Sequence, residues 1–112
     1  MSGYQKQKAP EEEKNMYGTV ANIRVKAGHE DGLKQLMQQW NAERKPKVQG
    51  AMSSYIFQLD SDPLDWILVA LFQDKDSYVA NAEDPEQDKW FRQLMEHLDG
   101  EPQWHDGEAF EA

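Results

Sequence analysis

The chain has 112 residues, of which 21 are aspartate or glutamate and 12 are lysine or arginine, so its formal net charge is −9. That length suits one domain with one hydrophobic core. An acidic chain without a concentrated basic stretch is unsuited to nucleic acid, because phosphate backbones bind clustered positive charge. Cysteine is absent, which excludes disulfides and thiolate chemistry and favours a cytoplasmic protein.

The N-terminal segment is polar and includes Pro10 and the acidic run Glu11–Glu13. It lacks the apolar core of a secretory signal, and no later apolar run is long enough to span a membrane. Because these residues offer little to bury, we expect residues 1–16 to form a flexible tail ahead of a domain at 17–112. An arm that grasps a partner is the alternative.

A strand and a helix are predicted next. Tyr17–Lys26 is rich in β-forming residues and is followed by Gly28, which predicts the first strand. From about His29 to Arg44, apolar residues recur at steps of three and four, which is typical of one face of a helix. We expect Pro46 to prevent this helix from continuing.

Two further strands are predicted as a hairpin. Met52–Leu59 holds aromatic and branched residues, Asp60–Pro63 has the composition of a turn, and Trp66–Phe72 is an unbroken apolar run. Side chains alternate faces along a strand, so the last of these strands is apolar on both faces. Two helices can cover one face, and we therefore predict that an identical subunit covers the other, giving a homodimer.

The remaining chain predicts two helices and a last strand. A short helix is expected from Asp76 or Ser77, and a longer one over Pro85–Leu98. Pro102–Phe110 suits an edge strand or an extended arm. The order strand, helix, strand, strand, helix, strand is the split βαβ pattern, so we predict an α+β, ferredoxin-like fold with a four-stranded antiparallel sheet.

The spacing of several short signals resembles a known family. These signals are the strand Val20–Val25 followed by Lys26-Ala27-Gly28, Gly50 before a strand, Asp62-Pro63, Phe72 before Asp74–Tyr78, Asp84-Pro85, and the pair Trp90-Phe91. Together they resemble the antibiotic biosynthesis monooxygenase domain, a member of the dimeric α+β barrel superfamily, over about Tyr17 to Glu108. The resemblance implies a homodimer that oxidises an electron-rich aromatic or quinol-like small molecule with O2 and without a cofactor.

The chain also departs from this family. Many relatives end the third strand with a glutamate and a tryptophan separated by one residue, where this chain has Ala70 and Phe72. The haem-degrading branch of the superfamily uses an asparagine on the first strand, a tryptophan on the third and a histidine on the second helical region. Asn22 is a candidate for the first, Phe72 replaces the second, and His97 lies late for the third. Haem binding or degradation is therefore a runner-up.

Cofactor-free oxygenation needs an apolar cavity, a proton acceptor, and donors that hold a developing oxyanion. Aromatic side chains from elements that meet between sheet and helices are the candidate substrate-binding residues. Ordinary core packing is the alternative for the same residues. They are Trp40, Trp66, Phe72, Trp90 and Phe91.

Three polar residues are the candidate catalytic groups. Asn22 lies in an otherwise apolar strand, where a buried amide needs a neighbour or a ligand as its partner. Tyr78 is preferred over Tyr55 for orienting a substrate through its hydroxyl. His97, two turns after Trp90, is suited to act as a base or, alternatively, as a cation at the helix end. No histidine–carboxylate group has metal-binding spacing and no nucleotide-binding loop is present, so we predict neither metal nor cofactor.

Two functions remain open at this point. One is a cofactor-independent monooxygenase, and the other is a non-catalytic dimer that binds a small ligand or serves as a stress-related module. An open pocket lined by Asn22 and His97 favours the enzyme, whereas a cavity filled by the chain's own aromatic side chains favours the module.

Overall fold

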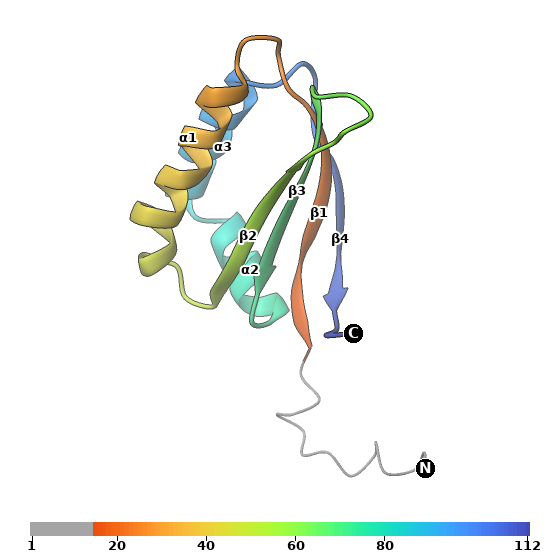
Figure 1. Ribbon diagram of the computed structural model, residues 1–112. Coiled ribbons are helices and arrows are strands. Elements are labelled where there is room, and N and C mark those ends of the chain that lie inside the picture. The colour runs from red at the N-terminus through yellow and green to blue at the C-terminus, as the bar shows by residue number, and fades with distance from the viewer. Residues whose placement is uncertain (1–14) are drawn as a thin grey trace.

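The computed structural model describes residues 15–112 (Figure 1). The expected tail therefore lies outside the described residues except at its end, where Met16 already pairs with Ala109 in the sheet. The strands and helices are β1 (Met16–Arg24), α1 (Glu30–Gln39), β2 (Ala51–Gln58), β3 (Asp65–Phe72), α2 (Lys75–Ala82), α3 (Pro85–Glu96) and β4 (Gln103–Ala109).

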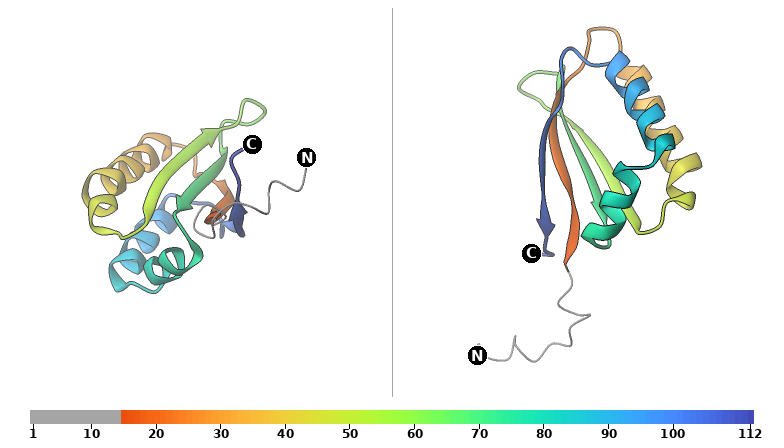
Figure 2. Two further views of the ribbon diagram at one scale, coloured as in Figure 1. Left: turned by 90° about the horizontal axis from the view of Figure 1, so that it is seen from below. Right: turned by 180° about the vertical axis from the view of Figure 1, so that it is seen from behind.

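The four strands form one antiparallel sheet in the order β2-β3-β1-β4. The helices cover one face of this sheet and leave the other face open in the described chain (Figures 1 and 2). This is the predicted α+β, ferredoxin-like arrangement. Because β1 lies between β3 and β4, the last strand of the chain lies next to the first, and Val20 stands between Val69 on one side and His105 on the other.

Local signals set the helix ends. The Asp74 carboxylate accepts a hydrogen bond from the Ser77 backbone N–H at 2.8 Å, and the Asp84 carboxylate accepts one from the Glu86 N–H at 2.9 Å. Both are side-chain caps that satisfy free N–H groups at a helix start. The cap at Asp74 lets α2 begin at Lys75, one or two residues before the expected start.

The end of the first helical region also differs from expectation. α1 stops at Gln39, a π-helical turn follows over Trp40–Arg44, and a 3-10 turn holds Lys45–Lys47. Pro46 thus lies within helical backbone instead of ending it. A proline is tolerated here because it falls in the first positions of the 3-10 turn, where its missing N–H breaks no hydrogen bond.

The core lies between the sheet and the helices. Its buried residues come from β1, β3, α1, α3 and the segments beside them: Ala21, Ile23, Val25, Leu33, Leu36, Met37, Trp66, Leu68, Leu94 and Leu98. Trp66 is 1% exposed, and its indole N–H donates to the Pro63 carbonyl at 2.7 Å. A buried aromatic ring whose polar atom is satisfied stabilises a core by about 2 kcal/mol or more.

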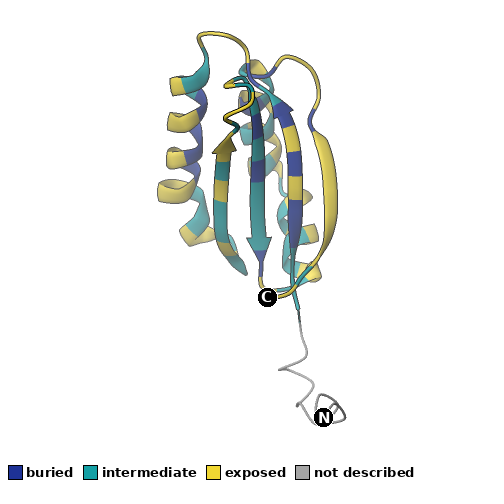
Figure 3. Ribbon diagram, turned by 45° about the vertical axis from the view of Figure 1, so that its right-hand side comes forward, coloured by how far each residue is buried: buried dark blue, intermediate teal, exposed yellow. Residues whose placement is uncertain are grey.

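The opposite sheet face is apolar and exposed. Tyr55 and Phe57 on β2 are 57% and 56% exposed, and Val20 on β1 is 43% exposed. They share this face with Ile67 and Val69 of β3, because residues paired across strands point the same way. Figure 3 shows the alternation of buried and exposed positions along β1. β3 is therefore apolar on both faces, as the sequence predicted.

Candidate functional site

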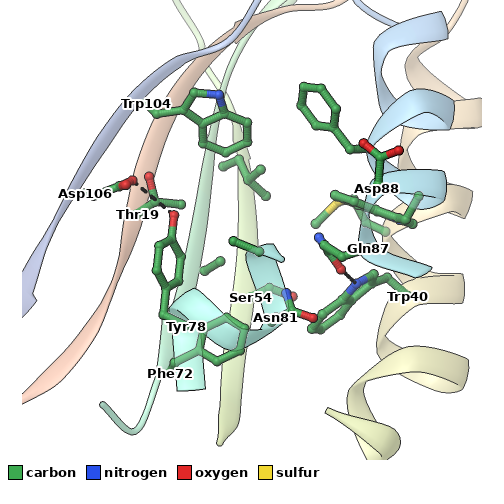
Figure 4. Close-up of a pocket in the computed structure, with 16 residues that line it drawn as sticks. Thr19, Trp40, Ser54, Phe72, Tyr78, Asn81, Gln87, Asp88, Trp104 and Asp106 are labelled. Carbon is green, nitrogen blue, oxygen red and sulfur yellow. Dashed lines mark hydrogen bonds between the residues drawn. The ribbon is translucent and has the colours of Figure 1, made fainter. Parts of the chain in front are cut away.

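A cavity of about 370 Å³ lies between the inner face of the sheet and the helices (Figure 4). All four strands and all three helices contribute to its wall. Five of the residues predicted for the site line it, namely Trp40, Phe72, Tyr78, Trp90 and Phe91. The volume falls within the range of small-molecule sites, and the wall is mainly aromatic and apolar.

The other three predicted residues lie away from the cavity. Trp66 is packed in the core nearer the start of β3. Asn22 is exposed on the outer face of the sheet, where its Oδ1 lies 3.1 Å from His105 Nε2. Inward positions of β1 are taken by Ala21 and Ile23, so strand alternation turns Asn22 outward. The expectation that its amide is buried is wrong.

His97 also lies outside the cavity wall. α3 ends at Glu96, so His97 is the capping residue and not part of the helix face that carries Trp90. Its Nδ1 lies 3.1 Å from His29 Nδ1, and its ring packs over Gly32 of α1. The imidazole is thus engaged with the first turn of α1.

Ring contacts hold the walls of the cavity in place. The Trp40 and Trp90 rings meet edge to face with their centroids 6.3 Å apart, and those of Phe72 and Tyr78 do so at 5.5 Å. Such tilted pairs are the favoured geometry for aromatic side chains. Trp40 is fixed further because its Nε1–H donates to Gln87 Oε1 at 3.0 Å. A flat ligand would therefore meet preset aromatic surfaces.

The main polar feature of the cavity is a hydrogen bond between Tyr78 and Asp106. The Tyr78 hydroxyl, on α2, donates to Asp106 Oδ1, on β4, at 3.0 Å (Figure 4). Burial and then the neighbouring carboxylate raise the pKa of Tyr78 to about 12. The phenol is therefore neutral at physiological pH and keeps a lone pair that can accept a hydrogen bond from a ligand hydroxyl.

One further polar atom of the residues that line the cavity is buried without a protein partner among the described residues. It is the indole nitrogen of Trp90, whereas the hydroxyl of the buried Thr19 lies beside the Tyr78 hydroxyl. Leaving such a group unsatisfied costs about 1–3 kcal/mol, so native structures rarely do so without a bound water or ligand.

The sequence did not indicate Thr19, Trp104 or Asp106 as site residues. Trp104 and Asp106 share the inner face of β4 because they are two positions apart, and Thr19 on β1 pairs directly with Asp106. The alternation of Trp104 and Asp106 was visible in the sequence. What was missing was the neighbour of that last strand, which places both side chains over the cavity.

The raised pKa of Tyr78 predicts a pH effect on stability. The folded state holds the phenol proton more tightly than the unfolded chain, whose pKa is near 10.0. The resulting stabilisation is complete below pH 10 and is lost as the pH rises to about 12. In urea unfolding series across this window, we expect the free energy of unfolding to fall more steeply for the natural chain than for Tyr78→Phe. Parallel curves would contradict the shift.

Metal-ligating side chains do not gather in the described part of the chain. Within residues 15–112, no group of three or more histidine, aspartate or glutamate side chains could hold a metal ion. In the same range, no helix has the length and apolar character needed to cross a membrane.

Solved structures share this fold, although no protein-family model and no curated protein matches the sequence. A structure from Bordetella bronchiseptica, provisionally named an antibiotic biosynthesis monooxygenase, has a TM-score of 0.75 at 17% identity, over 87% of this chain and 99% of that one. One from Caulobacter crescentus with the same provisional name has a TM-score of 0.75 at 14% identity, over 88% of this chain and 92% of that one. The structure of SnoaB, a cofactor-independent oxygenase from Streptomyces nogalater, has a TM-score of 0.72 at 12% identity, over 88% of this chain and 96% of that one.

These likenesses define the class of fold. The chain has the α+β fold of structures named antibiotic biosynthesis monooxygenases, and the resemblance indicated by the sequence is confirmed at the level of the fold. Identities of 12–17% establish shared architecture and leave the reaction to be argued from the site itself.

Proposed function

We propose that the protein is a cofactor-independent monooxygenase that oxidises an aromatic or quinol-like small molecule in the cavity between sheet and helices. The observation that carries this proposal is the Tyr78–Asp106 hydrogen bond inside an aromatic cavity of about 370 Å³. The fold shared with oxygenases of this kind supports it.

The proposed reaction needs no electrons from the protein. Loss of a proton from a phenolic or enolic substrate leaves an electron-rich carbanion, which reduces O2 and forms a carbon–oxygen bond. One oxygen atom stays in the product as a carbonyl and the other leaves as water, so a ring CH2 and O2 become C=O and H2O. The substrate supplies the electrons and the cavity has to accept and guide the proton.

Tyr78 and Asp106 are suited to that proton transfer. The Tyr78 oxygen can accept a hydrogen bond from the substrate hydroxyl while its own proton is directed at the Asp106 carboxylate. Asp106 is exposed on an edge strand, so a proton delivered there can pass to water. In this proposal Tyr78 orients the substrate and Asp106 is the acceptor. Asn22 and His97 have no place in it, because neither lines the cavity.

Oxygen uptake by the purified protein with a panel of anthrones, hydroquinones and flavonols tests the proposal. We expect Tyr78→Phe to lower kcat by about a hundredfold with a smaller change in KM, because the lost hydroxyl acts mainly on the transition state. Tyr55→Phe is the matched control and should react at the natural rate, since Tyr55 lies on the outer face. Absence of uptake across the panel would contradict the proposal.

A non-catalytic ligand-binding module is the second candidate, and the placement of Asn22 and His97 outside an open cavity favours it. It would bind the same flat aromatic compounds without consuming oxygen. Calorimetric binding combined with zero oxygen uptake would support this candidate over the enzyme. No observation favours haem, because the imidazole of His97 is paired with His29 away from the cavity.

We further propose that the active form is a homodimer joined through the exposed sheet face. Tyr55, Phe57 and Val20 form an apolar surface there together with Ile67 and Val69. Exposed apolar patches of this kind typically mark an interface. In a twofold interface the same patch serves both subunits, so a single apolar sheet face is sufficient to join two copies.

A further inference from the structure

The charged side chains of the cavity wall are all negative. Of the sixteen described residues that line it, two are carboxylates, Asp88 and Asp106, and none is a lysine, arginine or histidine. Figure 4 shows the two on opposite sides, with Asp88 on α3 and Asp106 beside Tyr78 on the sheet side. A ligand in the cavity would therefore lie between negative groups.

The two carboxylates differ in how far they are neutralised. Asp106 accepts a hydrogen bond from the neutral Tyr78 phenol, which has no positive charge to offset that of the carboxylate. Asp88 has a cationic neighbour one helical turn away, since Arg92 Nη2 lies 3.0 Å from its Oδ2. Arg92 therefore offsets part of the Asp88 charge. Among the described residues no lysine, arginine or histidine forms an ion pair with Asp106, so Asp106 makes the larger contribution to the potential inside the cavity.

The remaining polar groups of the wall favour uncharged oxygen atoms. The Trp90 N–H, on a residue that lines the cavity, is buried and has no protein partner among the described residues. An indole N–H is a neutral donor and does not compensate a full negative charge as a guanidinium would. A carboxylate bound here would lose its hydration without gaining a cationic partner, which is unfavourable in a mostly apolar site.

We propose that this cavity selects aromatic ligands by charge: it admits uncharged or cationic rings and excludes aromatic carboxylates and other aromatic anions. Asp106 is the main specificity-determining residue, and Asp88 is the second. The inference rests on the proposed function in placing the ligand in this cavity, but it does not require that the ligand be oxidised.

Calorimetric titration with a matched pair of ligands tests the selection. Naphthamide and naphthoate have nearly the same shape, and only the second is an anion at neutral pH. We expect naphthamide to bind at least about tenfold more tightly at low ionic strength, because charges a few ångströms apart in a partly buried site repel strongly. Naphthylmethylammonium should bind at least as well as naphthamide.

Variants of the two carboxylates complete the test. Asp106→Asn should reduce the preference for naphthamide, Asp88→Asn should reduce it less, and the double variant should remove it. A double variant with Asp31→Asn and Glu96→Gln is the control, since it changes the net charge equally at exposed positions outside the cavity wall. Circular dichroism confirms that each variant is folded.

The outcomes separate this inference from the proposed reaction. Equal affinities for naphthamide and naphthoate, a preference that persists in the Asp88/Asp106 double variant, or failure of all three probes to bind would each overturn the charge selection. A preference that is lost only in the cavity variants supports it, even where oxygen uptake is zero. In that case the proposed oxygenase activity is rejected, and the proposed selection of uncharged or cationic aromatic ligands is retained.

Discussion

Replacing Gly18 by alanine is expected to destabilise the domain by about 3 kcal/mol or more. A Cβ built on Gly18 would collide with the carbonyl oxygen of Ala70 and lie 3.1 Å from Leu71 Cα, both in the backbone of the neighbouring strand β3. Backbone atoms of a central strand cannot move aside without breaking the β1–β3 ladder, so the overlap has to be relieved by separating the strands. Urea unfolding followed by circular dichroism measures the loss.

Gly107→Ala is the matched control for this prediction. Gly107 is the direct cross-strand partner of Gly18 on the edge strand β4, yet a Cβ there would meet no atom within 4 Å. We expect its free energy of unfolding to stay within about 0.5 kcal/mol of the natural chain. Similar losses for the two variants would show that glycine is needed for chain flexibility rather than for the close approach of β1 and β3.

The sequence was sufficient where one strong local signal determines an element. The unbroken apolar run at Trp66–Phe72 predicted a strand buried on one face and apolar on the other, and β3 has both properties. Pro85 after Asp84 predicted the start of α3, where the Asp84 carboxylate caps the helix. Capping and alternation act within a few residues, so they can be recognised without knowledge of the fold.

The sequence was misleading in β1, where an inward side chain is polar and an outward one is apolar. In β1 the polar Thr19 is 4% exposed and the apolar Val20 is 43% exposed, so hydrophobicity along the strand does not follow burial. Tertiary packing decides which alternate side chains of the strand face the core, and it places Thr19 and Ala21 inward and Asn22 outward. Composition alone therefore could not establish which face Asn22 occupies.

The site itself depends on contacts between distant parts of the chain. Tyr78 was predicted as a site residue, but its partner Asp106 is 28 positions away and comes near it because β4 pairs with β1. His97 was predicted from its spacing to Trp90, which holds only while the helix continues, and α3 ends one residue earlier. Sequence spacing predicts a shared face within an element and gives no direct measure of distance between elements.

Introducing glutamate at both Tyr55 and Phe57 is expected to convert the proposed dimer into a monomer at micromolar concentration. These side chains are more than half exposed in the single chain, and burying an aromatic side chain contributes about 1.5–3 kcal/mol. Two carboxylates per subunit would remove that gain and bring like charges together across a twofold interface. We therefore expect the dissociation constant of the dimer to rise at least about a thousandfold. Sedimentation equilibrium measures the change.

The control for the dimer is a charge placed on an exposed apolar residue of the helical side. Val79 on α2 is 38% exposed, and Val79→Glu should leave the sedimentation behaviour unchanged because the helices cover the opposite face of the sheet. Were the natural chain itself monomeric at micromolar concentration, the outer face would need another partner. Because the cavity lies entirely between sheet and helices of one chain, the monomeric variant should retain aromatic-ligand binding, which separates the role of the interface from that of the site.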